Sequence, residues 1–166
     1  MIELLETGVD GLDGVLHGGV ARNATVLVGG NPGTGKSILS MQYLYEGVRQ
    51  YDERGIYLSF EETANDIALA AESIGFDDWR DFVDRGDIVV YDERDLLDAD
   101  DFSTTFDMVL EYVAVEGYGR LVMDSLTMFS MFFTTERERR TYLLRFIDIL
   151  KESGLTSLLV AEQGAI

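Results

Sequence analysis

The chain contains no cysteine, and Lys36 and Lys151 are its only lysines among 166 residues. The absence of cysteine excludes disulfide bonds, thiolate metal sites and cysteine nucleophiles together. No apolar run approaches the roughly 18 residues that a membrane-spanning helix needs, and the first residues lack the basic start of a secretory signal peptide. We therefore expect a cytoplasmic protein without a membrane partner.

Acidic residues dominate the charge, because 31 Asp and Glu oppose 13 Lys and Arg for a net charge of -18. Self-repulsion at this level opposes compact folding in dilute salt, whereas molar salt screens charges within about 3 Å. The composition is typical of an organism with a salty cytoplasm, such as a haloarchaeon, and an acidic mesophilic protein is the alternative. Nonspecific binding of DNA or RNA is disfavoured because no basic stripe could displace counterions.

The length is that of one domain, and we expect residues 1–166 to form it. Apolar, β-branched segments alternate with amphipathic ones. The predicted strands cover residues 25–28, 56–60, 88–91, 120–124 and 155–161. The predicted helices follow residues 37, 63, 103 and 135, the last three ending near Gly75, Gly117 and Gly154. This alternation predicts an α/β fold: a mostly parallel sheet, flanked by helices on both faces, with ligands beyond the carboxyl ends of its strands.

A complete phosphate-binding loop of the form G-x-x-x-x-G-K-[ST] separates the first predicted strand from the first helix. It consists of Gly30, Asn31, Pro32, Gly33, Thr34, Gly35, Lys36 and Ser37, and Ile38 follows it in the predicted nucleotide site. Its glycines let backbone N–H groups point into one concavity at the positive end of the helix, which suits an anion. We expect Lys36 to contact the β- and γ-phosphates of ATP or ADP, and the Ser37 hydroxyl to bind Mg²⁺.

Carboxylates follow two other predicted strands. Asp124 ends the strand over 120–124, where P-loop proteins hold their Mg²⁺ ion. Glu61 and Glu62 follow the strand over 56–60, where one carboxylate could orient and deprotonate the attacking water. Adjacent strand residues point to opposite faces, so we expect only one of the two to face the nucleotide, and we favour Glu61. The alternative is a pair of solvent-facing acids at a helix N-terminus.

Three further segments have simpler interpretations. The acidic stretch 91–101 is predicted to be a solvated loop. The apolar run 128–133 is either core or a subunit contact. Arg137, Arg139 and Arg140 alternate with acids, which favours a solvated helix start over a phosphate-binding patch.

Several segments together resemble the KaiC-like branch of the RecA/RadA ATPase superfamily. They are residues 7–13, 18–20, 30–37, 58–63 and 122–127, in the order of that family and over almost the whole chain. The resemblance implies a RecA-like P-loop NTPase core that binds ATP at the subunit boundaries of a ring, commonly a hexamer. It also implies that Lys36 and Ser37 contact the phosphates and Mg²⁺, that Asp124 holds the metal, and that Glu61 activates water with support from Glu62.

The resemblance leaves three functions open. The first is Mg²⁺-dependent ATP hydrolysis in a regulatory or signalling homo-oligomer with an unidentified protein partner. The second is a nucleotide-binding module with little catalysis, because family members continue past residues 161–166 into strands whose basic residues reach a neighbour's ATP. The third is a RadA-like, DNA-dependent recombinase, for which basic DNA-contacting loops are missing. Clock members have two such domains and phosphorylate themselves, so clock function and autokinase activity do not follow for one domain.

Overall fold

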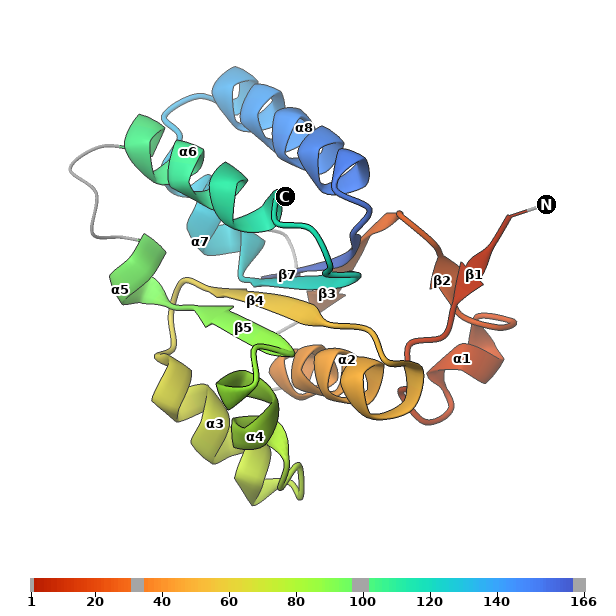
Figure 1. Cartoon of the computed structure of the whole chain (residues 1–166). Coiled ribbons are helices and arrows are strands. Elements are labelled where there is room, and N and C mark those ends of the chain that lie inside the picture. The colour runs from red at the N-terminus through yellow and green to blue at the C-terminus, as the bar shows by residue number, and fades with distance from the viewer. Residues whose placement is uncertain (1, 31–34, 97–101, 163–166) are drawn as a thin grey trace.

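The computed structural model describes residues 2–30, 35–96 and 102–162. Five parallel strands form the central sheet, in the spatial order β3-β7-β6-β4-β5 (Figure 1). In chain order they are β3 (Thr25–Gly30), β4 (Gly55–Ser59), β5 (Ile88–Tyr91), β6 (Arg120–Asp124) and β7 (Thr156–Glu162). The predicted α/β fold with a parallel sheet is confirmed, and each predicted strand is found within two residues of its expected ends.

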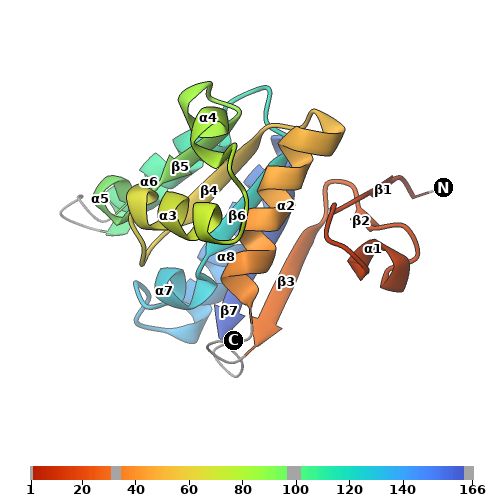
Figure 2. The same cartoon turned by 90° about the horizontal axis from the view of Figure 1, so that it is seen from below.

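Helices cover both faces of this sheet (Figure 1). One face carries α6 (Phe102–Val113), α7 (Leu126–Ser130) and α8 (Glu136–Glu152). The other face carries α2 (Lys36–Tyr51), α3 (Ala64–Ser73) and α4 (Trp79–Asp84). The remaining elements are the antiparallel pair β1 (Leu4–Leu5) and β2 (Val20–Ala21), and the short helices α1 (Leu12–Val15) and α5 (Glu93–Leu96). In Figure 2, α2 separates α3 and α4 from the unit formed by β1, β2 and α1.

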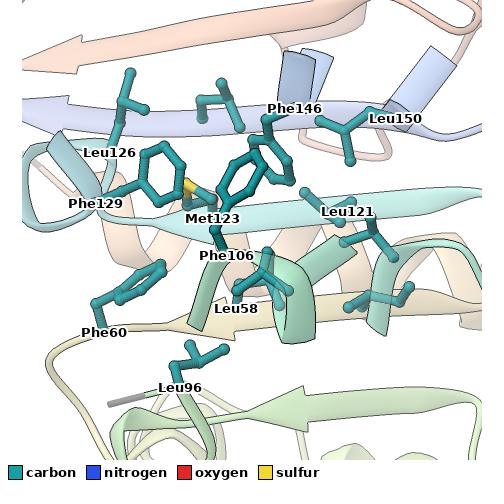
Figure 3. Packing of buried hydrophobic residues seen from close by; sticks show 14 of the residues in the cluster. Leu58, Phe60, Leu96, Phe106, Leu121, Met123, Leu126, Phe129, Phe146 and Leu150 are labelled. Atoms are coloured by element: carbon teal, nitrogen blue, oxygen red, sulfur yellow. The ribbon is translucent and has the colours of Figure 1, made fainter. Parts of the chain in front are cut away.

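Two hydrophobic clusters, one on each face, hold the layers together. Leu58 and Leu121 point into the cluster under α6, α7 and α8, where Phe106, Phe129 and Phe146 meet (Figure 3). Tyr57 and Val122, one position along the same strands, belong instead to the cluster under α2, α3 and α4. Successive strand residues thus bury opposite faces, which explains why these strands are apolar almost throughout.

Side-chain caps and glycines set the helix ends largely as predicted. The hydroxyls of Thr63 and Thr135 each accept the backbone N–H three residues along, both at 3.1 Å, and so begin α3 and α8. The Glu138 carboxylate in turn accepts the backbone N–H of Thr134 at 3.3 Å, just before the start of α8. Gly75 follows α3 with φ of 92°, a conformation that disfavours any side chain.

The prediction of a solvated loop over 91–101 is wrong where the structure describes that stretch. Tyr91 ends β5, the Asp92 side chain is buried, and α5 follows directly. The carboxylate of Asp92 accepts the backbone N–H of Ala64 at 2.9 Å, so it fixes the start of α3. The sequence does not indicate this role, because nothing in a run of acidic residues distinguishes a buried capping carboxylate from a solvated one. Residues 97–101 lie outside the described residues.

The apolar run 128–133 belongs mainly to the core. Phe129 and Phe133 are buried in the cluster of Figure 3, whereas Met131 is 71% exposed. Most of the run is therefore explained by packing inside one chain, and only Met131 presents a large apolar surface to solvent.

Candidate nucleotide-binding site

The register of the sheet brings the predicted functional segments to one edge. Asp124 at the end of β6 pairs with Ser59 at the end of β4, and Gly30 at the end of β3 pairs with Glu162 at the end of β7. A pocket of about 400 Å³ opens beyond these strand ends. It is lined by Gly35, Lys36, Ser37, Ile38, Glu61, Asp124, Ser125, Val160, Ala161 and Glu162. The predicted site residues that the structure describes thus converge, apart from Gly30 and Glu62, which are not in the lining.

The phosphate-loop helix begins at the mouth of this pocket. Gly35 precedes α2 with φ of 88° and no side-chain cap, so the first backbone N–H groups of α2 are not satisfied by a capping side chain. The Lys36 ammonium folds back to the carbonyl oxygen of Gly30. Asn31, Pro32, Gly33 and Thr34 lie outside the described residues. The described part places one mobile cation and one helix N-terminus where the sequence predicts a phosphate.

Ser37 and Asp124 meet although 87 residues separate them in the chain. The Ser37 hydroxyl donates to Oδ2 of Asp124 at 3.0 Å, and the Tyr57 hydroxyl donates to the same oxygen at 3.2 Å. Burial first, and the Asp124 charge second, raise the pKa of Tyr57 well above its ordinary value, so Tyr57 remains a donor. The contact between a hydroxyl and a carboxylate is the pairing that P-loop proteins use to hold Mg²⁺.

Glu61 and Glu62 lie just beyond β4, in the bend that leads to α3. Glu61 lines the pocket, whereas the backbone of Glu62 is fixed by the Ser59 hydroxyl, which accepts the Glu62 N–H at 3.1 Å and donates to its carbonyl at 2.8 Å. Partial burial, followed by the charges of Asp124 and Glu162, raises the pKa of Glu61. Partial burial, followed by Asp124, Asp66 and Glu61, raises the pKa of Glu62. Both carboxylates are therefore more basic than free glutamate.

Sequence reasoning gave no role to two residues of this site, Tyr57 and Glu162. Tyr57 donates to Asp124 from inside β4, and its only signal in the sequence is a tyrosine between two aliphatic residues of the strand. Glu162 lines the pocket, and its backbone N–H donates to the Thr127 hydroxyl at 3.2 Å. The position of Glu162 at a strand end is a signal that the sequence carries, but its contact with α7 depends on the tertiary structure.

Two features are absent from the described residues. These residues contain no group of three or more His, Cys, Asp or Glu side chains placed to hold a metal ion. They also contain no helix with the length and apolar character needed to cross a membrane. A single carboxylate and a hydroxyl remain compatible with Mg²⁺, which commonly binds through one or two protein ligands plus substrate phosphates.

Comparison with known proteins gives the same family from sequence and structure. The chain is 33% identical to the circadian clock oscillator protein KaiC of Parathermosynechococcus lividus over 164 residues, covering 95% of this chain and 30% of that protein. It is 32% identical to KaiC of Synechococcus elongatus over 168 residues, covering 98% of this chain and 32% of that protein. The chain thus spans about a third of the length of these relatives.

A solved structure shares the fold. The crystal structure of the KaiC-like protein PH0186 from the hyperthermophilic archaeon Pyrococcus horikoshii OT3 matches with a TM-score of 0.81 and 30% identity. The match covers 98% of this chain and 71% of that chain. The five-stranded parallel sheet is therefore a KaiC-like, RecA-type core. The family described as "ATPase: KaiC" matches residues 5–165, and with the phosphate-loop helix and strand-end carboxylates in place, the chain belongs to this family of P-loop, nucleotide-binding ATPases.

Proposed function

We propose that the chain binds ATP with Mg²⁺ and hydrolyses the bond to the γ-phosphate, and that residues 1–166 act as one domain. The observation that carries the proposal is the contact of 3.0 Å between the Ser37 hydroxyl and the Asp124 carboxylate, in a pocket that Lys36 and Glu61 also line. A purely structural Gly-rich turn would not require a lysine, a hydroxyl and two carboxylates to converge from three strand ends.

Phosphate binding is assigned to the loop and the first turn of α2. The assigned nucleotide-binding residues are Gly30, Asn31, Pro32, Gly33, Thr34, Gly35, Lys36, Ser37 and Ile38. The N–H groups in the first turn of α2 and the Lys36 ammonium would together neutralise the β- and γ-phosphates. ADP would use the same contacts except those to the γ-phosphate.

Mg²⁺ would be held by Ser37 and Asp124, whose oxygens already lie within one hydrogen bond of each other. The ion would supply charge neutralisation to the phosphate oxygens during phosphoryl transfer. Tyr57 would act as a positioning residue, because its hydrogen bond restricts the carboxylate of Asp124 from the side of β4.

Glu61 is assigned as the base. A water molecule in the pocket would give a proton to Glu61 while its oxygen bonds to the γ-phosphorus, and the bond from that phosphorus to the ADP oxygen would break. The raised pKa of Glu61, due first to burial and then to Asp124 and Glu162, makes it a better proton acceptor than free glutamate. Glu62 would support the bend, because its backbone is tied to Ser59.

Lys36 is the only cation in the lining of this pocket among the residues that the structure describes. In related phosphoryl-transfer sites, a second cation raises kcat by several orders of magnitude. We therefore propose that a neighbouring subunit completes the site in a homo-oligomeric ring such as a hexamer, and that an unidentified protein partner binds according to the state of the ring. If no subunit supplies that cation, the chain acts as a nucleotide-binding module with little turnover.

Phosphate release from Mg·ATP in concentrated KCl tests the proposal. We expect turnover in the unchanged protein, none in Lys36→Ala, and a loss of about 10²- to 10⁴-fold in Glu61→Gln. Glu62→Gln is the matched control, because it removes the neighbouring charge from outside the pocket lining, and we expect a much smaller loss. Full turnover in Glu61→Gln would refute the assignment of the base.

Two further arms separate the alternatives. ATP binding without phosphate release above the Lys36→Ala background would favour the binding module. Hydrolysis stimulated by single-stranded DNA, with a steep dependence on salt, would favour the recombinase. We expect no stimulation, because the net charge of -18 repels a polyanion.

A further inference from the structure

The positive charges of this acidic chain divide into two groups. Away from α8, the described arginines pair with acids; they are Arg22, Arg49, Arg54, Arg80, Arg85 and Arg120. The cations of α8 form no ion pair with any residue that the structure describes; they are Arg137, Arg139, Arg140, Arg145 and Lys151. Arg145 lies over the ring of Phe106, 5.7 Å from its centroid, and is explained by that contact. Ion pairing with the described residues does not explain Arg139 and Arg140, in a chain where acids outnumber bases by 31 to 13.

Arg139 and Arg140 line a pocket of about 280 Å³ between α7 and α8. Its walls are largely apolar and include Leu126, Phe129 and Leu143. Phe129 also belongs to the core cluster of Figure 3, so this wall is fixed by packing. Glu136 is the one acid in the lining, and it leaves the two arginines with an excess of one positive charge.

Apolar walls with a few convergent polar groups are the usual composition of a small-molecule site, and this volume suits a small ligand. The two guanidinium groups supply donors that match a planar anionic head. Nucleic acid is a poor fit, because the walls of the cavity are apolar and the net charge of -18 repels polyanions.

Helix α7 lines this pocket, and its N-cap residue lines the nucleotide site. Ser125 lines the nucleotide pocket and begins α7, since its hydroxyl accepts the backbone N–H of Met128 at 3.3 Å. Leu126, the next residue, lines the second pocket. Thr127 in turn accepts the backbone N–H of Glu162, which lines the nucleotide pocket. A displacement of α7 would therefore change the geometry of both pockets.

We propose that the pocket between α7 and α8 is a second binding site, for a small amphipathic anion whose apolar body lies against Leu126, Phe129 and Leu143 and whose head binds Arg139 and Arg140. Occupancy would alter nucleotide affinity through α7, and this second clause rests on the proposed function. Reciprocal coupling requires two distinct sites and an element whose arrangement both ligands bias, and α7 is that element here.

Titration calorimetry with octanoate as the probe tests the binding clause, with octanol as the matched neutral probe. We expect octanoate to bind more tightly than octanol, and Arg139→Gln and Arg140→Gln to weaken octanoate about tenfold each without changing octanol. Arg137→Gln is the control, because this exposed residue lies on the same helix but does not line the pocket. We expect it to bind octanoate as the unchanged protein does.

Equal binding of the two probes, or normal octanoate binding by both arginine variants, would overturn the proposal. The proposal would also be overturned if the unchanged protein does not bind octanoate and Arg139→Gln lowers the molar mass measured by light scattering. The pocket would then be a subunit contact. Circular dichroism checks that each variant folds.

ATP titrations with and without saturating octanoate test the coupling clause. A change in ATP affinity that Arg139→Gln abolishes supports it, and an unchanged affinity overturns it. If ATP fails to bind at all, the octanoate titration still decides the binding clause, so failure of the proposed function and failure of this inference are distinguishable.

Discussion

Replacement of Arg120 should be among the most destabilising single changes in this chain. Arg120 is fully buried at the start of β6. One of its terminal nitrogens donates to the carbonyls of Thr7 and Tyr43, both at 2.9 Å, and the other donates to the carbonyl of Glu6 and to the Glu53 carboxylate, at 3.2 Å for the latter. The side chain thus ties the N-terminal segment to the phosphate-loop helix.

The magnitude follows from what Arg120→Ala leaves behind. Three carbonyls lose a donor, the partly buried Glu53 carboxylate keeps only its contact with Arg22, and the guanidinium leaves empty volume against the rings of Tyr43 and Tyr51. Breaking a buried charge pair from one side costs about 3–5 kcal/mol. At about 2–4 °C per kcal/mol for a chain of this size, the melting temperature should fall by about 6–20 °C. Arg120→Met should recover the packing but not the hydrogen bonds.

Thermal unfolding followed by circular dichroism in concentrated KCl measures this effect. Arg80→Ala is the control, because its ion pair with Glu72 is half exposed and should contribute at most about 1 kcal/mol. Hydrogen exchange should also show faster exchange in β1 and β2 of Arg120→Ala. An Arg120→Ala protein that melts within 2 °C of the Arg80→Ala protein would refute the reasoning.

Three further predictions follow from the same structure. Gly47→Ala, normally stabilising in a helix, should destabilise this protein in chemical denaturation, because the added Cβ would lie 2.6 Å from Cδ of Arg120. Thr135→Ala should lower the free energy of unfolding by about 1 kcal/mol, and Thr135→Ser should restore most of it. Since burial and neighbouring acids raise the pKa values of Glu61 and Glu62 in the folded state, their contribution should favour folding below pH 4.5 and disappear as the pH rises. The double Gln variant should therefore lose part of the gain in melting temperature that the unchanged protein shows on acidification, and an unaltered pH profile would contradict this.

The sequence is sufficient for those parts of the fold that depend on local patterns. Apolar β-branched runs identify the strands, and Thr63 shows why a helix start is readable, since its cap is satisfied within three residues. The parallel direction of the strands also follows from the alternation of strands and helices.

Contacts between distant segments are the part that the sequence does not reveal. Asp92 caps α3 across 28 residues, and Tyr57 reaches Asp124 across 67, so neither has a local signature. The same holds for Arg120, whose partners come from the N-terminal segment and α2. For the site, the sequence predicts which residue types occur at the strand ends and favours Glu61 over Glu62, and Glu61 is the one that lines the pocket. The contact of Ser59 with Glu62 that holds the bend after β4 has no signature in the sequence.

Calorimetric titration of the folded protein with ATP, with and without Mg²⁺ in concentrated KCl, tests the central claim most directly. We expect one nucleotide per chain, tighter binding with Mg²⁺ than without it, and no binding to Lys36→Ala. A well-folded protein that takes up neither ATP nor ADP would contradict the assignment of the phosphate loop, and with it the function proposed for this chain.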